Sequence, residues 1–247
     1  MSGHSHAKTI KHQKELTDQK RGQAFSKIAR LISVAVKEKG VNPETNPRLR
    51  MAIEAARAAN MPKDNIDRAI KKGTGEDVSV ENLEEVIFEG FGPGGSAIII
   101  EGITDNKNRT LGEIKQALNQ YGGKLAGEGA VRWMFEKKGC LTIDMDSQDD
   151  ELKDKEVLEM ASIEAGAQDI RWHDGTLDVY TEIEDFEKVK KVLEEKKIKV
   201  DSASLDWTPK EEVTPDEKDK ESCQKLFEAL DDLDSVQGIY SNLKEEG

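Results

Sequence analysis

The sequence predicts an α+β protein of three domains: an N-terminal three-helix basic domain and two ferredoxin-like α/β sandwich domains, the middle one completed by the C-terminus. Three observations support this fold class. Apolar residues recur at helical spacing up to about residue 75, after which strand patterns alternate with helical ones. The segments after Gly139 follow the order β-α-β-β-α-β, which is typical of the ferredoxin-like sandwich. The net charge also changes sign near Gly75.

Three short helices are predicted in the basic domain, which we place at residues 1–75. The first 17 residues are polar and basic, and they predict a mobile arm or a frayed first helix. A helix from about Asp18 to Gly40 is predicted by an apolar stripe that comprises Phe25, Ile28, Ile32, Ala35 and Val36. Asn46 is a suitable N-cap for a second helix that starts at Pro47 and runs to Asn60. A third helix is expected from Pro62 to Gly73.

The middle domain is predicted to be discontinuous in sequence, with residues 80–137 joined by residues 216–247. Its first part predicts strands at 83–91 and 96–104, a helix at 109–121 and a strand at 131–135. This block lacks a second helix and a fourth strand. The helix predicted at 223–230 and the strand predicted at 236–241 cannot bury a core alone, so we expect them to fold back and complete the block.

The third domain is predicted at residues 138–207. Its expected elements are a strand at 140–145, a helix at 151–165, strands at 169–173 and 177–181, a helix at 185–195 and a strand at 199–205. A turn at Asp174-Gly175 separates the two inner strands, and His173 beside it is expected to be a strand or turn residue.

The charge of the chain is strongly asymmetric. The 247 residues contain 37 Lys and Arg against 50 Asp and Glu, a formal net charge of −13, which as an average argues against a nucleic-acid partner. Residues 1–75, however, hold 16 cations and 7 acids, a net of +9, and the rest carries −22. This split suggests nucleic-acid contact by the basic head, although a helical domain with solvated lysines would show the same charge.

The expected nucleic-acid contacts are cationic residues of the arm and helices, several of which fall off the apolar stripe as phosphate-facing side chains must. Arg57 and Arg68 add positive charge to the same helices. The predicted contact set is Lys8, Lys11, His12, Lys14, Lys20, Arg21, Lys27, Arg30, Arg50, Lys63, Lys71 and Lys72.

Other binding chemistry finds little support in the sequence. Gly90, Gly92 and Gly95 spell GxGxxG, but a strand pattern follows where a dinucleotide site needs a helix, so a hairpin turn is expected. No phosphate loop, metal-ligand spacing or catalytic constellation is recognised, and Cys140 and Cys223 stand alone. We therefore expect no cofactor, no metal and no enzyme activity. No apolar run approaches the length of a membrane span, and no signal peptide is recognised; a cytoplasmic monomer is expected.

One loop leaves an alternative open. Asp105, Asn108 and Arg109 lie where a strand passes into a helix, and a helix N-terminus can hold an anion or contribute to an enzyme site in an inter-domain cleft. Capping of the helix by Asp105 or Asn108 is the simpler interpretation.

Several motifs in order give the chain a resemblance to the YebC/PmpR family, which includes the mitochondrial translational activator of cytochrome c oxidase. The motifs are Gly3-His4-Ser5, Lys20-Arg21-Gly22, Asn46 to Arg50, Asn60 to Ile66, Glu89 to Gly95, Thr104 to Thr110 and Val236 to Asn242. The resemblance implies a basic helical domain, two α/β domains, no enzymatic activity and a role in gene expression. The chain departs from the family pattern at His6, Ala7, Gln13 and Phe91.

Two functions follow from this resemblance and from the basic head. The first is a DNA-binding transcriptional regulator that acts at promoters. The second is a ribosome-associated translation factor that binds ribosomal or transfer RNA and relieves stalling. Both require a surface that contacts phosphates, and the sequence does not separate them.

Overall fold

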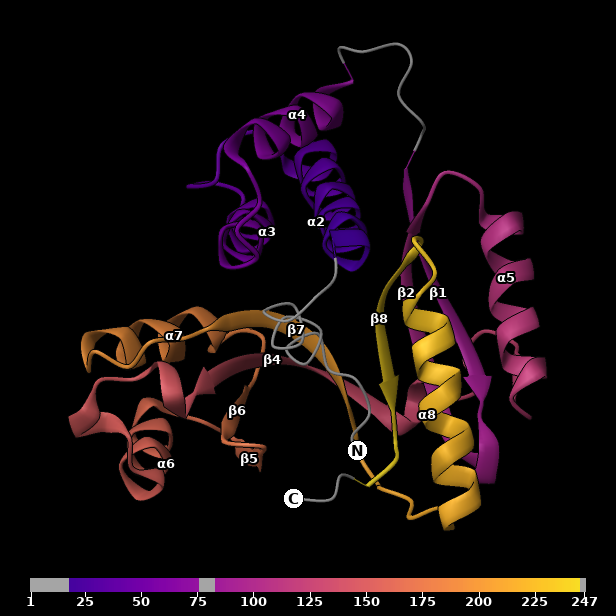
Figure 1. Ribbon diagram of the computed structural model, residues 1–247. Helices are drawn as coiled ribbons and strands as arrows, with labels where there is room; N and C mark the ends of the chain where they lie inside the picture. Colours follow the sequence, from indigo (N-terminus) through magenta and orange to yellow (C-terminus); the bar gives the residue numbers. More distant parts are fainter. Residues whose placement is uncertain (1–17, 76–82, 245–247) are drawn as a thin grey trace. The chain divides into compact units, whose positions relative to one another are not determined.

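The computed structural model describes residues 18–75 and 83–244 (Figure 1). It confirms the α+β class, with helices at the N-terminus and two antiparallel four-stranded sheets. Residues 136–208 form one compact unit, and the described residues up to 135 form the other together with residues 209–244. The three-domain boundaries given above stay a prediction.

Three helices form the head, as predicted: α2 (Asp18–Lys39), α3 (Pro47–Ala58) and α4 (Lys63–Thr74). Their apolar stripes meet in one core to which Ile32, Leu49 and Ala56 contribute fully buried side chains. Helices α2 and α4 approach so closely that the Ser33 hydroxyl of α2 donates to the Ala69 carbonyl of α4 at 2.9 Å. A Cβ at Gly73 would lie only 2.6 Å from the Ser33 carbonyl oxygen.

Asn46 joins two helix ends in the head. Its side-chain oxygen Oδ1 accepts from the N–H of Leu49 at 3.0 Å, which confirms the predicted N-cap of α3. Its amide also donates to the carbonyls of Ala35 and Gly40 at 2.8 and 2.9 Å, at the C-terminal end of α2. The side chain is fully buried with donors and acceptor paired.

The first sheet has the strand order β3-β1-β2-β8 and is antiparallel throughout. Its strands are β1 (Glu84–Phe91), β2 (Ala97–Thr104), β3 (Lys124–Ala126) and β8 (Val236–Ser241). Helices α5 (Lys107–Gln120) and α8 (Glu217–Asp231) lie along one face (Figure 1). One core contains residues from both helices together with Ile100 of β2 and Ile239 of β8, which pair in the ladder. The C-terminal helix and strand therefore complete this sheet and its core, as predicted, although α8 begins at Glu217, six residues before the predicted start at 223.

The prediction of a strand at Val131–Phe135 was wrong. The third strand of this sheet is β3, and Arg132–Met134 form the short helix η3. The buried carboxylate of Glu89 holds this segment: it accepts from the backbone N–H groups of Gly129 and Val131 at 2.8 Å and of Arg132 at 3.0 Å. These donors are the groups that a strand would need for a ladder. The turn between β1 and β2 contains the short helix η2 (Pro93–Gly95), in which Gly94 and Gly95 have φ of 65° and 75°.

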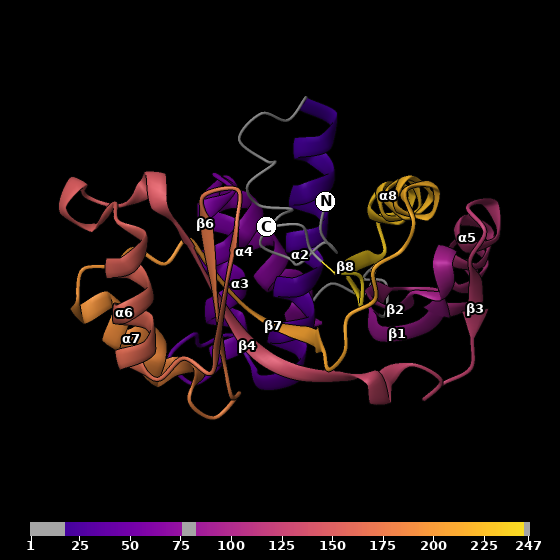
Figure 2. The ribbon, with the colours of Figure 1, turned by 90° about the horizontal axis from the view of Figure 1, so that it is seen from below.

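The second unit is ferredoxin-like, with the sheet order β5-β6-β4-β7. Its strands are β4 (Phe135–Asp144), β5 (Asp169–His173), β6 (Thr176–Thr181) and β7 (Ser202–Pro209), and its helices are α6 (Lys155–Ala165) and α7 (Phe186–Glu195). The two helices lie side by side, as Figure 2 shows. Leu141 faces Val179 and Ile143 faces Leu177 in the β4–β6 ladder, and all four are fully buried.

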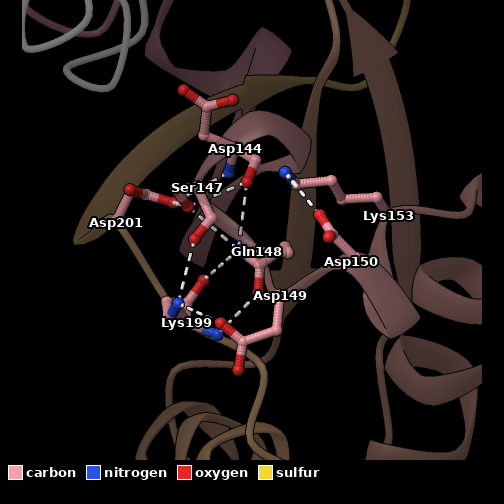
Figure 3. Close-up of polar contacts among 8 residues, drawn as sticks. All are labelled: Asp144, Ser147, Gln148, Asp149, Asp150, Lys153, Lys199 and Asp201. Atoms are coloured by element: carbon pink, nitrogen blue, oxygen red, sulfur yellow. Dashed lines mark hydrogen bonds and ion pairs between the residues drawn. The ribbon is translucent and has the colours of Figure 1, made fainter.

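Three elements in this unit begin three or more residues from the predicted start: β4 at Phe135 rather than at 140, α6 at Lys155 rather than at 151, and β7 at Ser202 rather than at 199; β7 also ends at Pro209 rather than at 205. Asp154 caps α6 by accepting from the N–H groups of Glu156 and Val157, and a network of side chains precedes β7 (Figure 3). Gln148 donates to the carbonyl of Lys199 at 2.9 Å and accepts from its N–H at 2.8 Å. Asp201 accepts from the N–H of Asp144 at 2.8 Å and from the Ser147 hydroxyl at 2.9 Å. The backbone groups are thus satisfied by side chains instead of by a longer helix or ladder, with the short helices η4 (Met145–Ser147) and η5 (Asp150–Leu152) in between.

Candidate nucleic-acid interface

Positive charge is concentrated in the described part of the head. Residues 18–75 hold 13 Lys and Arg against 6 Asp and Glu, a net of +7, whereas residues 136–208 hold 11 against 21, a net of −10. The structure separates the cations of the head into two groups, which differ in whether a carboxylate or a carbonyl oxygen of the chain already contacts the charged group.

Six exposed cations form the first group, which we call the open cations: Lys20, Lys39, Arg57, Lys63, Arg68 and Lys71. None of the ion pairs found in the described residues includes them. Their exposure follows from the helix pattern, since Ile66 and Ala69 face the core and thereby turn Arg68 and Lys71 of α4 outward. Lys20, Lys63 and Lys71 were predicted contacts, and the structure adds Lys39, Arg57 and Arg68.

A second group has partners on the acidic part of the same unit. The Lys27 ammonium lies 2.8 Å from Oδ1 of Asp231 and donates to the Asp231 carbonyl at 2.5 Å. The Arg30 guanidinium donates to the carbonyl of Asp234. Lys27 and Arg30 were predicted contacts, and in this arrangement both are occupied by the turn that follows α8.

Further cations of the head are also engaged. Arg48 bonds Glu85 in a two-pronged ion pair and reaches Glu38 at 2.9 Å; the hydrogen bond to Glu85 is the main cause of the raised pKa of its guanidinium. Arg21, Arg50 and Lys72 of the predicted set have partners too, so they do not count as open cations. Lys8, Lys11, His12 and Lys14 lie outside the described residues.

The loop before α5 does not present a free helix N-terminus. Asn106, and neither Asp105 nor Asn108, caps α5, with its side-chain oxygen accepting from the N–H of Arg109 at 3.0 Å. The predicted cap residues were therefore wrong by one or two positions. The guanidinium of Arg109 bonds Asp105 at 2.5 Å, so the cation and the acid of this loop balance each other. Whether the loop binds an anion stays a prediction.

Within 18–75 and 83–244, no group of three or more His, Cys, Asp or Glu side chains is placed to hold a metal ion, and no helix is long and apolar enough to cross a membrane. Cys140 and Cys223 are buried free thiols, and burial raises the pKa of each. His173 is a buried residue at the end of β5, with Nε2 3.5 Å from Asp178.

Comparison with known proteins decides the family. Residues 5–76 match the TACO1/YebC N-terminal domain, and residues 83–243 match the second and third domain of TACO1/YebC proteins. The chain belongs to the TACO1/YebC family. This confirms the resemblance seen in its motifs, and the two matches together span both the basic head and the α/β part of this TACO1/YebC protein.

Its relatives are similar over their full length. A "Probable transcriptional regulatory protein" of Syntrophus aciditrophicus is 48% identical over 242 residues, covering 98% of this chain and 95% of the relative. A protein of the same name from Thermotoga maritima is 47% identical over 244 residues, covering 99% and 94%. A solved structure, "Conserved Hypothetical Protein Aq1575 from Aquifex Aeolicus", is 42% identical with a TM-score of 0.85 and 93% of each chain covered.

Proposed function

We propose that this TACO1/YebC protein is a non-enzymatic regulator of transcription that binds duplex DNA through the open cations of its helical head. The observation that carries the proposal is the set of six exposed cations, Lys20, Lys39, Arg57, Lys63, Arg68 and Lys71, on a head of net positive charge. Regulatory relatives at 45–48% identity support the transcriptional role.

The electrostatics favour the head as the binding surface. A cation that neutralises a phosphate releases condensed counterions, which stabilises the complex without any contact to a base edge. The ferredoxin-like unit, with a net charge of −10, repels the same phosphates. We infer that DNA binds the head while the acidic unit remains available to protein partners.

The test is the salt dependence of duplex DNA binding by the full chain. The variant Arg68→Gln/Lys71→Gln removes two open cations that lie three residues apart on α4. Each lost phosphate contact should flatten the slope of log Kobs against log salt by about 0.9, so the double variant should lose about 1.8.

A matched control removes the same charge at the same spacing elsewhere. Lys188→Gln/Lys191→Gln changes two exposed lysines three residues apart on α7 in the acidic unit. This variant should keep the wild-type slope. Equal slopes for the two double variants, or no binding of duplex DNA by the wild-type chain, would overturn the proposal; tight binding of structured RNA alone would instead favour a role in translation.

A further inference from the structure

The turn after α8 occupies a second basic face of the head. Gln23, Lys27 and Arg30 lie four and three residues apart on α2 and therefore point to one side of the helix. They contact residues 231–234, which we call the acidic turn. Gln23 donates to the carbonyl of Asp232 at 2.6 Å, Lys27 bonds the carbonyl and the carboxylate of Asp231, and Arg30 bonds the carbonyl of Asp234.

The chemistry of this contact resembles that of a phosphate contact. The acidic turn contains three acids in four residues and starts at Asp231, the last residue of α8, where carbonyls without a partner inside the helix carry partial negative charge. Lysine, arginine and glutamine side chains are also the groups that donate to phosphate oxygens in nucleic-acid complexes. The same donors on α2 therefore cannot serve the acidic turn and a phosphate at once.

The contact can be released without unfolding the head. The core of the head is built by Ile28, Ile32 and their partners on α3 and α4, and none of these residues takes part in the contact. The Asp231 side chain is 46% exposed and that of Lys27 is 11% exposed, so water and salt reach the ion pair from the Asp231 side. A phosphate oxygen can replace the Asp231 carboxylate as the charged partner of the Lys27 ammonium.

We propose that the acidic turn is an internal competitor of nucleic acid, which holds Lys27 and Arg30 of α2 until phosphates displace it. This proposal rests on the proposed function and concerns the regulation of the same surface. While the acidic turn is bound to α2, only the open cations contact DNA; release of the turn adds Lys27 and Arg30 to the contact surface. The turn thereby weakens binding to any nucleic acid that cannot compete for α2.

The experiment compares two neighbouring substitutions in the full chain, with a fluorescent DNA duplex as the probe. Asp231→Asn removes the carboxylate that pairs with Lys27. Asp232→Asn removes the same charge from the same turn, but the Asp232 side chain is exposed and enters no ion pair within the described residues. Asp231→Asn should bind at least roughly fivefold more tightly than Asp232→Asn, as expected for a coupled pair of sites. Its salt slope should be steeper by about 0.9, which is one additional phosphate contact.

A double-mutant cycle with Lys27→Gln shows whether the gain comes from the freed lysine. In the Lys27→Gln background, Asp231→Asn should bind no more tightly than Asp232→Asn, because no ammonium is left to release. If the two aspartate variants bind equally in the wild-type background, or if the gain survives Lys27→Gln, the competitor role is wrong. That result differs from failure of the proposed function, in which the wild-type chain binds no duplex at all.

Discussion

Removal of the Glu89 charge should destabilise the segment at residues 129–132, which precedes the ferredoxin-like unit in the chain. One carboxylate oxygen accepts from the Gly129 N–H at 2.8 Å and from the Arg132 guanidinium at 3.1 Å; the other accepts from the N–H groups of Val131 and Arg132. Glu89→Gln keeps the shape but replaces one oxygen by an NH2 group. Two donors lose their acceptor whichever way the amide turns.

The magnitude follows from the burial of the site. The Glu89 side chain is 1% exposed, so water does not replace the lost bonds. Each buried donor left unsatisfied costs about 1–3 kcal/mol, so the two donors together should lower the free energy of unfolding of Glu89→Gln by roughly 2–6 kcal/mol. Glu128→Gln, on the same segment but 88% exposed and 3.9 Å from Arg132, should change it by less than about 0.5 kcal/mol.

The assay combines denaturant unfolding with hydrogen exchange at the three donor amides. Exchange at Gly129, Val131 and Arg132 should accelerate in Glu89→Gln and stay slow in Glu128→Gln. If the two variants lose the same stability, or if the three amides remain protected in Glu89→Gln, the anchoring role of this carboxylate is refuted.

The pH dependence provides a second check on Glu89. Burial opposes its ionisation, but the three backbone N–H groups and Arg132 outweigh this effect and lower its pKa. A carboxyl with a lowered pKa in the folded state contributes stability above the unfolded value of about 4.3, and this contribution is lost as the pH falls through the folded pKa. The stability difference between wild type and Glu89→Gln should therefore be full at pH 7 and should shrink as the pH falls below 4.

Two further substitutions test the packing of the head. Asn46→Ala removes the cap of α3 and the two hydrogen bonds to the C-terminal end of α2, so it should lower the free energy of unfolding by more than the roughly 1 kcal/mol of an ordinary cap. Asn46→Asp keeps the cap and should retain part of that free energy. Equal losses in the two variants, measured by denaturant unfolding, would contradict the role of Asn46 at both helices. Gly73→Ala places a Cβ 2.6 Å from the carbonyl oxygen of Ser33 and should lower the free energy of unfolding by about 1–3 kcal/mol. Gly112→Ala in α5, where a Cβ would meet nothing within 4 Å, should leave stability unchanged or raise it. The same shift of the melting temperature in both variants would contradict the close approach of α2 and α4.

The local signals in the sequence predict much of the fold. The apolar stripe of α2, the cap at Asn46 and the β-α-β-β-α-β order each depend on residues close together in the chain, and the structure contains all three. The return of α8 and β8 to the first sheet is also predictable, because the ββαβ block lacks one helix and one strand. The alternating pattern wrongly predicted a strand at Val131–Phe135, because backbone N–H groups of this segment donate to the carboxylate of Glu89, which is about forty residues earlier in the chain.

The division of the basic residues could not be predicted from the sequence. Lys27 and Lys63 look alike as exposed-face lysines, yet Lys27 pairs with Asp231, which lies 204 residues further along the chain. The spacing that turns Lys27 away from the head core aligns it with Gln23 and Arg30 against the acidic turn. The α5 cap shows the same limit on a smaller scale, because Asp105, Asn106 and Asn108 are all suitable caps and the backbone geometry selects Asn106.

The most direct test of the proposed nucleic-acid interface is a map of lysine reactivity on the full chain, with and without bound duplex DNA. DNA should protect Lys20, Lys63 and Lys71 of the head from an amine-reactive reagent. Lys188 and Lys191 of the acidic unit should react equally in both states. Protection of the acidic-unit lysines with unchanged reactivity at Lys63 and Lys71 would contradict the claim that the head carries the nucleic-acid interface.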